Sequence, residues 1–403
     1  MLDLVQIEPM NNVCVEPPAS DHPDHRIFPR AAQTDFQRRV YCLFGMPVDA
    51  VRVADVVTRI RACATARQRF FLATPNLNCY VISLHSAQYR ETVLRSDLST
   101  IDGQPLRWSA RLMGLPAPEK VSGSTVFEQL RAHGGAPLSV YFLGSDEATS
   151  AAATARMNAA PSGLTCLGGS APGFGSVQDM SGDTLLAHIN ASGADFLIVA
   201  LGAHKGNAWI IRNQERLRIP VAAQLGAVIN MAAGNISRAP LFVQNIGCEW
   251  LWRIKEEPAL WRRYFHDGLA FLRLLATRLL PFLLTQRRLL PSQALRRPAL
   301  VTLDEMPQAT VLHLSGTWDD ADLSTLRQSL AQAAARTLAI HIELQYLQFI
   351  DSATLGLILL LYGHQLKAGL PLHCHHATST VARLFTLHCA DYLLQIEPSS
   401  PVQ

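Results

Sequence analysis

In the larger part of the chain, short apolar runs alternate with amphipathic stretches. Phe70–Ala73, Ser139–Leu143 and Asp195–Leu201 are mostly apolar and each ends in a turn, which predicts buried strands. Ala148–Asn158 and Ser181–Ile189 have the apolar spacing of helices and lie between those strands. This alternation predicts an α/β fold, with a Rossmann-like, mainly parallel sheet that helices cover on both faces.

Toward the end of the chain, apolar and polar residues follow a different pattern. Val311–Ser315 and Ala339–Leu344 predict strands, whereas Ala321–Ala335, Ala353–Lys367 and Thr378–His388 predict helices. The pattern therefore predicts a second, smaller α/β domain after the first.

Residues 1–38 show no apolar periodicity, and prolines interrupt them. This pattern is typical of a flexible leader, and the order of basic and then apolar residues that marks a signal peptide is missing. We therefore expect a cytoplasmic protein with a leader at 1–38, a large α/β domain at 39–260, a basic segment at 261–298 and a small domain at 299–397.

The composition is that of a folded protein, with 49% hydrophobic and 17% charged residues in a chain of 403. The formal net charge is only +3, and no run of Lys and Arg is interleaved with aromatic residues, so we expect no nucleic-acid partner. The eight cysteines form no CxxC pair and no zinc spacing, which predicts free thiols in a reducing compartment. We expect neither a metal site nor a cofactor.

Much of the positive charge lies in and around the basic segment. Leu269–Leu284 carries Arg273 and Arg278 inside an apolar run and Pro281 near its end. A membrane-spanning helix of about twenty residues rarely contains such charges, whereas an amphipathic helix in the membrane interface directs them toward anionic headgroups. The interpretation as an interfacial helix predicts a protein that is peripheral on the inner face of the cell membrane. The alternative is a helix that packs on the protein's own surface.

Four turns that follow apolar runs combine small and polar residues, at 73–76, 101–103, 143–145 and 201–205. In open parallel sheets, ligands bind at the carboxyl ends of the strands, so we expect the functional site at these turns. Each turn taken alone is also typical of ordinary loop geometry, since Gly, Asp and Asn favour turns for steric reasons.

Taken in order, the motifs of the large domain resemble the WecG/TagA/CpsF family of glycosyltransferases. Each motif is short, but the ordered set is specific. The stretches that carry the resemblance are Phe44-Gly45-Met46-Pro47-Val48-Asp49, Thr74-Pro75-Asn76, Asp102-Gly103-Gln104-Pro105-Leu106, Trp108, Arg111-Leu112-Met113-Gly114, Val121-Ser122-Gly123-Ser124, Phe142-Leu143-Gly144, Gly202-Ala203, Lys205, Trp209, Gly226-Ala227, Gly234, Arg238-Ala239-Pro240, Glu249-Trp250-Leu251-Trp252-Arg253 and Glu257-Pro258-Ala259-Leu260-Trp261-Arg262-Arg263-Tyr264.

The resemblance implies an inverting, metal-independent glycosyltransferase of surface polysaccharide biosynthesis. Such an enzyme moves an N-acetylhexosamine or hexose unit from a UDP-sugar to a polyprenyl-diphosphate-linked acceptor. Asp102 corresponds to the family's proposed catalytic base, and a carboxylate suits this role because the acceptor hydroxyl must lose its proton as it attacks the anomeric carbon. The implied substrate-binding residues are Thr74, Asn76, Gly144, Gly202, Lys205, Asn230, Arg238 and, from the C-terminal appendage over the diphosphate, Arg262 and Arg263.

The chain departs from the family pattern at polar positions. Gly206 stands where the family has a glutamine, Asn230 where it has an aspartate, and Thr125 where it has an acidic residue. Two hypotheses follow. Asp102 favours an active transferase, whereas Gly206, Asn207 and Asn230 favour a catalytically impaired protein that senses a nucleotide sugar or a lipid and signals through the small domain.

The segment Phe349-Ile350-Asp351-Ser352-Ala353-Thr354-Leu355-Gly356 resembles the signature of STAS domains, and Gly316 and Gly369 fall where that fold has glycines. The resemblance implies a STAS-like regulatory domain with a protein partner. It also makes Ser352 a candidate phosphorylation site, where a phosphate adds nearly two negative charges to a docking surface. The alternative is that Asp351 and Ser352 only cap the helix that follows them.

Overall fold

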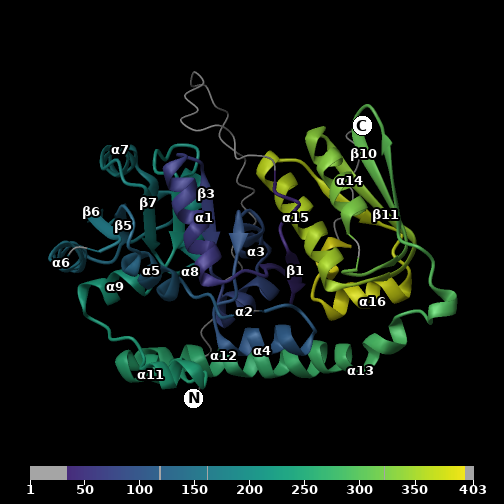
Figure 1. The fold of residues 1–403 in the computed structure, drawn as a ribbon, viewed down its shortest axis with the longest axis horizontal. Helices are drawn as coiled ribbons and strands as arrows, with labels where there is room; N and C mark the ends of the chain where they lie inside the picture. Colours follow the sequence, from purple (N-terminus) through teal and green to yellow (C-terminus); the bar gives the residue numbers. More distant parts are fainter. Residues whose placement is uncertain (1–33, 118, 161, 322, 395–403) are drawn as a thin grey trace, which may run out of the picture.

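The computed structural model describes residues 34–117, 119–160, 162–321 and 323–394 (Figure 1). The described chain holds a six-stranded sheet, a four-stranded sheet and a two-stranded hairpin. We call residues 34–257 the large unit and residues 299–394 the small unit.

The sheet of the large unit is wholly parallel, with the strand order β4-β3-β8-β7-β5-β6. The predicted strands at 70–73, 139–143 and 195–201 are confirmed as β3, β5 and β7. Three further strands are short or rich in Gly and Ala, so they lack the apolar runs that predict strands. The strands are β3 (Phe70–Ala73), β4 (Leu98–Ser99), β5 (Leu138–Gly144), β6 (Leu164–Ser170), β7 (Phe196–Ala200) and β8 (Val221–Gln224).

Helices cover both faces of this sheet. On β7, Phe196 and Ile198 enter one buried core, whereas Leu197 and Val199 enter the other. Successive strand residues point to opposite faces, so two cores on one strand confirm the Rossmann-like, two-sided arrangement. The helices are α1 (Val53–Thr65), α2 (Leu77–His85), α3 (Ala87–Leu94), α4 (Gln104–Leu112), α5 (Gly123–Ala132), α6 (Glu147–Asn158), α7 (Asp183–Ala191), α8 (Ala203–Asn213), α9 (Val228–Ala233), α10 (Leu241–Asn245) and α11 (Glu249–Glu256).

The small unit is a mixed sheet with helices packed against it. Its strand order is β12-β11-β10-β9, in which only the β9–β10 pair is antiparallel. Gly316 was expected after a strand, but it lies inside β10 at a register shift, with φ +79°. The elements are β9 (Leu300–Glu305), β10 (Ala309–Trp318), α14 (Ser324–Ala335), β11 (Ala339–Ile350), α15 (Ser352–Ala368), β12 (Leu372–His375) and α16 (Ser379–Leu387).

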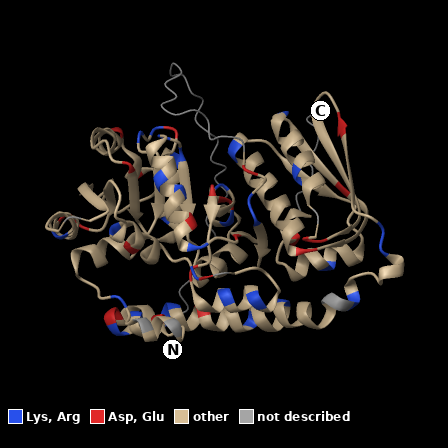
Figure 2. Cartoon of the chain, in the orientation of Figure 1, with Lys and Arg blue, Asp and Glu red and all other residues tan. Residues whose placement is uncertain are grey.

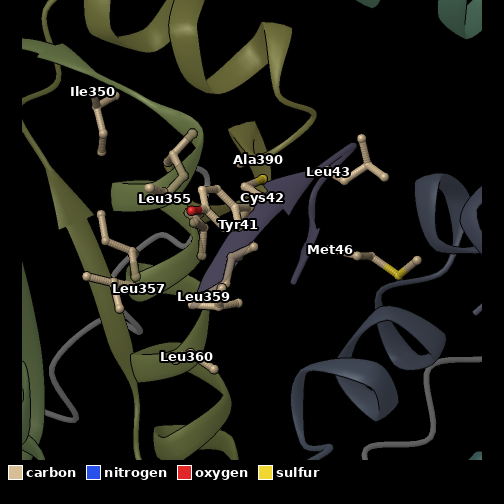
Figure 3. Packing of buried hydrophobic residues seen from close by; sticks show 14 of the residues in the cluster. Tyr41, Cys42, Leu43, Met46, Ile350, Leu355, Leu357, Leu359, Leu360 and Ala390 are labelled. Carbon is tan, nitrogen blue, oxygen red and sulfur yellow. The ribbon is translucent and has the colours of Figure 1, made fainter. Parts of the chain in front are cut away.

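The two units share one apolar core. The hairpin of β1 (Val40–Leu43) and β2 (Met46–Asp49) packs along α15, and the buried cluster runs from this hairpin into the sheet of the small unit (Figure 3). Two glycines of α15 allow the close approach. A Cβ on Gly356 would lie 2.7 Å from the Val40 carbonyl oxygen, and one on Gly363 would lie 2.1 Å from that of Leu94. The small domain therefore has its own sheet but not its own separate core.

Polar contacts add to this interface. The Tyr392 hydroxyl donates to the Gly45 carbonyl at 2.8 Å, and Lys367 pairs with Asp97 at 2.5 Å. The predicted leader can be tested only from residue 34 onward, since residues 1–33 lie outside the described chain. Phe36 is buried in the shared core, and the Arg38 guanidinium pairs with Asp49, so these residues are packed and not flexible.

Most of the basic segment forms one continuous helix, which we call the docked helix, along the lower edge of both units (Figure 1). It consists of α12 (Trp261–Leu274), a π-helical turn (Leu275–Leu279) and α13 (Leu280–Leu289). Its inner face docks on the protein. Asp267 accepts a hydrogen bond from the Asn78 amide at 3.0 Å, and Phe282 packs edge-on against the buried His388 ring. Burial lowers the pKa of His388 to about 4, so this contact is apolar at neutral pH.

The outer face of the same helix exposes aromatic and aliphatic side chains, namely Trp261, Phe265, Leu269, Leu272, Leu280 and Leu284. Arg273 is exposed beside them, whereas Arg278 faces inward, where its charge acts on the Cys389 thiol. The two arginines therefore do not share a face, contrary to the expectation of a single basic face. Among the described residues, Pro258–Thr285 is one helix long and apolar enough to cross a membrane by length and composition.

Candidate functional site

The predicted turns meet at the carboxyl edge of the parallel sheet, because they follow β3, β4, β5 and β7. Backbone hydrogen bonds hold two of them together. Asp102 donates its N–H to the Pro75 carbonyl at 3.3 Å, and Val121 donates to the Ile101 carbonyl at 2.9 Å. The structure thus brings the turn of Thr74 and the turn of Asp102 side by side at the start of α5.

The surroundings of Asp102 disfavour the ionised form of its carboxyl group. Burial raises its pKa from 3.8 to about 7; Lys120 opposes the rise, Glu249 adds to it, and Arg238 opposes it. A carboxyl group that titrates near neutral pH is well matched to accept a proton at that pH. The geometry and the charge therefore both support Asp102 as a general base.

Arg238 reaches the same cluster from the loop before α10. Its guanidinium donates to the Thr125 hydroxyl at 2.7 Å and forms an ion pair with Glu128. Thr125 stands at the position where an acidic residue was expected, so Glu128, one helical turn further along α5, supplies a carboxylate to Arg238. A cavity of about 140 Å³ lies beside this pair, between α5 and α9.

Thr74 and Asn76 lie at the end of β3. A Cβ on Gly123 would overlap the Leu225 side chain and would lie 3.4 Å from the Thr74 hydroxyl, so the glycine lets α5 begin close to Leu225, with Thr74 beside it. The side-chain oxygen of Asn76 accepts a hydrogen bond from the Cys79 N–H at 3.2 Å and caps α2. Asn76 is exposed, and its cap orients the N-terminus of α2 at the site.

The two predicted glycines have different roles. A Cβ on Gly144 would lie 2.6 Å from the Ala200 carbonyl oxygen, so this glycine is required by the neighbouring strand. Gly202 has φ +78°, precedes α8 and has open space in front of its Cα, which suits close approach of a ligand to the helix N-terminus. Lys205 is exposed on α8 and donates to the Gly175 carbonyl at 2.8 Å.

The structure explains the glycine at position 206. A Cβ there would lie 2.7 Å from Cγ and 2.9 Å from Cδ of Gln224, at the end of β8. A glutamine side chain from the strand therefore occupies the space beside the helix. Its buried Oε1 has no hydrogen-bond partner among the described residues. Asn230 is partly buried on α9, and Asn207 is buried on α8.

Arg262 and Arg263 are exposed in the first turn of α12. The Arg262 guanidinium lies 5.6 Å from the centre of the Trp261 ring. Burial raises the pKa of Asp267, and the charge of Arg263 opposes that rise. Because Asp267 binds Asn78, the helix that carries both arginines is docked on α2, whose N-cap is at the site. The structure gives these arginines no direct contact with Asp102.

Sequence reasoning missed three residues at the site: Lys120, Gln224 and Glu249. Glu249 belongs to one of the motifs quoted above, but nothing in its local pattern indicated a partner. No group of three or more His, Cys, Asp or Glu side chains in the described chain is placed to hold a metal ion.

Ser352 lies away from this site, in the interface between the units. It is buried, and its hydroxyl donates to the Cys42 carbonyl at 2.8 Å. The helix cap is Asp351, which accepts hydrogen bonds from the N–H and the hydroxyl of Thr354. Ser352 is therefore an interface residue and not the cap, and its hydroxyl is buried between the two units.

Comparison with known proteins agrees with this architecture. Residues 301–395 match the model described as the Mlab, STAS domain. An N-acetylglucosaminyldiphosphoundecaprenol N-acetyl-beta-D-mannosaminyltransferase of Bacillus spizizenii is 26% identical over 194 residues, which are 48% of this chain and 74% of that protein. Residues 41–283 match the model of the WecG/TagA/CpsF glycosyl transferase family. That match covers most of the large unit, Asp102 and most of the docked helix, and it identifies the chain as a glycosyltransferase of the WecG/TagA/CpsF family.

Proposed function

We propose that this glycosyltransferase moves an N-acetylhexosamine or hexose unit from a UDP-sugar to a polyprenyl-diphosphate-linked acceptor, with inversion, in the synthesis of a surface polysaccharide. The observation that carries the proposal is Asp102, a partly buried carboxyl group with a pKa of about 7 at the carboxyl edge of the sheet. The Bacillus spizizenii relative is named for the transfer of an N-acetyl-beta-D-mannosaminyl unit to N-acetylglucosaminyldiphosphoundecaprenol.

In the proposed step, the Asp102 carboxylate takes the proton of the acceptor hydroxyl. The hydroxyl oxygen then forms the bond to the anomeric carbon, and the bond from that carbon to the nucleoside diphosphate breaks. A single displacement of this kind inverts the anomeric centre. The leaving diphosphate is met by the N-termini of α2 and α8 and by Lys205 and Arg238, with Arg262 and Arg263 above it.

A lipid-linked acceptor requires the site to lie close to a membrane. The helix that starts directly after Asp102, α4, exposes Trp108 and Leu112, and α11 exposes Trp250 and Leu251. We call these residues and the outer face of α12 and α13 the apolar face. Arginines accompany it along α4 and the docked helix (Figure 2). A wide apolar surface flanked by cations is typical of interfacial binding.

We therefore propose that the protein is peripheral on the inner face of the cell membrane, with the apolar face in the lipid. In this proposal the STAS-like domain, whose α15 packs along the hairpin, regulates the transferase. Its α15 face is in contact with the large unit, so a further protein partner has to bind elsewhere or displace that contact.

The activity is tested by incubating the full chain with UDP-N-acetylmannosamine, UDP-N-acetylglucosamine or UDP-glucose and a polyprenyl-diphosphate N-acetylglucosamine. We expect transfer from one donor, and a loss of about 10²- to 10⁴-fold in Asp102→Asn. Nucleotide binding without transfer from any of these donors would favour the second hypothesis, a sensor that has lost catalysis, for which Gly206, Asn207 and Asn230 remain the motivation.

Membrane binding is tested separately, by flotation with vesicles that contain anionic phospholipid. Changing Leu269 and Leu272 to Ser should weaken binding about tenfold or more, because both side chains are exposed on the apolar face. Leu167→Ser is the matched control, since Leu167 is equally an exposed leucine but lies on β6. Equal binding by all variants would refute the interfacial helix.

A further inference from the structure

Several charged or titratable groups face Asp102, and they come from separate elements. Lys120 lies in the loop before α5, Arg238 in the loop before α10, and Glu249 in the first turn of α11. The Cys79 thiol of α2 also senses the Asp102 charge. The charge of the catalytic carboxyl group is therefore set by the arrangement of four elements and not by its own loop alone.

Two of these groups are paired with each other. Lys120 Nζ lies 2.7 Å from Glu249 Oε2, and the Lys120 side chain is only 11% exposed. An ion pair with one partner almost fully desolvated holds the ammonium group in one place more firmly than a surface pair does. The Lys120 charge also acts on Asp102, where it lowers the pKa of the carboxyl group.

The helix that carries Glu249 is itself held in place. Trp252 donates its indole N–H to the Ser237 carbonyl at 3.1 Å, and Glu256 accepts from the Ser237 N–H at 3.0 Å. These contacts fix α11 against the loop that also supplies Arg238. The position of the Lys120–Glu249 pair thus depends on how α11 sits over the carboxyl edge of the sheet.

We infer that Glu249 is a positioning residue, which holds the Lys120 ammonium group away from full contact with Asp102 and so keeps the base able to accept a proton at neutral pH. The inference rests on the proposed function only for its kinetic consequence. Removal of Glu249 takes one negative charge away and frees Lys120 for Asp102, and both changes favour the ionised carboxylate. Removal of Lys120 has the opposite effect.

The direct test is NMR of the full chain labelled with [¹³Cγ]aspartate, in which the resonance missing from Asp102→Asn identifies Asp102. Wild-type Asp102 should titrate near pH 7. The midpoint should fall in Glu249→Gln and rise in Lys120→Gln, with the two variants about one pH unit or more apart. Glu249→Asp should stay close to the wild type. Glu257→Gln is the control, because Glu257 lies just past the far end of α11 and pairs with Arg253.

The kinetic test follows the acid limb of the pH profile of kcat, with the donor found above. The limb should move to lower pH in Glu249→Gln and to higher pH in Lys120→Gln. A residue that only stabilises α11 would lower activity at every pH without moving the limb. Midpoints that do not move, or that move in the same direction in both variants, would overturn the inference. Since the NMR titration needs no turnover, its result stands even where no sugar is transferred from any donor.

Discussion

The side chain of Asp102 lowers the stability of the folded protein whenever it is ionised. Its pKa is about 7 in the folded state and 3.8 when unperturbed, with burial as the first cause. Between pH 4 and pH 7 the folded state therefore keeps a proton that the unfolded chain has lost, so stability falls as the pH rises through this window and levels off above it.

Asp102→Asn should for this reason be more stable than the wild type by about 2 kcal/mol at pH 8, with a margin that shrinks toward pH 4. Urea unfolding at pH 4.5, 6 and 8 measures the difference. A margin that is the same at all three pH values would mean that Asp102 does not titrate within the window.

Gly206 and Gln224 depend on each other. A side chain at position 206 has to enter the space that the Gln224 side chain occupies, since its Cβ alone would lie 2.7 Å from Gln224 Cγ. Gly206→Gln should therefore lower stability by about 1–3 kcal/mol through overpacking. Adding Gln224→Gly should recover most of that loss. Thermal unfolding of the two single variants and the double variant forms the cycle, and additive effects would show that the two positions do not compete for space.

At the scale of elements, the docked helix has two distinct faces. Leu274 is 5% exposed and packs in the shared core, whereas Leu272, two residues earlier, is 62% exposed. Leu274→Ala should cost about 2–4 kcal/mol, and Leu272→Ala should cost less than about 0.5 kcal/mol. Chemical unfolding gives both values, and limited proteolysis reports whether the helix detaches. Equal costs at the two positions would mean that the inner face carries no more packing than the outer one.

The two faces also bear on both interpretations of the sequence of this helix. Asp267, Phe282 and Arg278 face the protein, which is the docking interpretation, while the exposed leucines and Arg273 remain available to a lipid surface. The spacing of Leu and Arg along this helix cannot distinguish docking on the protein from binding to a membrane, because both partners favour leucines on one face.

At the scale of the whole molecule, the close packing of α15 on the hairpin makes the STAS-like domain part of the transferase. Gly363 faces the backbone of Leu94 so closely that a Cβ would be 2.1 Å from the carbonyl oxygen. Gly363→Val should therefore wedge the units apart, lower the melting temperature, and speed hydrogen exchange in β1 and β2. Gly268→Ala is the control, since nothing lies within 4 Å of its Cβ position. A Gly363→Val protein with unchanged melting and exchange would argue against a shared core.

The same packing bears on regulation. Ser352 donates to the Cys42 carbonyl inside this interface, so a phosphate there would put charge into an apolar contact. The STAS resemblance pointed to Ser352 as a candidate phosphorylation site on a docking surface, but its surroundings are set by the hairpin near the other end of the chain.

Much of the fold could be predicted from local pattern. The predicted β3, β5, β7 and α6 end within two residues of their positions in the structure. Buried parallel strands require apolar runs and helices require apolar spacing, and both are properties of a few neighbouring residues. β4, β6 and β8 were not predicted, because two residues suffice for β4 and the other two are weakened by Gly or Ala.

The sequence by itself determined the mainly parallel sheet and the second, smaller α/β domain. It also determined the family resemblance, the placing of Thr74 and Gly202 at strand ends, and the placing of Asp102 just past an apolar run. These follow from order along the chain, since parallel strands bring their carboxyl ends to one edge. Only the tertiary structure decided that Glu249 and Lys120 face Asp102, that Gln224 fills the space beside Gly206, and that Ser352 is buried. Those relations join residues far apart in the chain, and they depend on how close packing of helices and strands distributes space and charge.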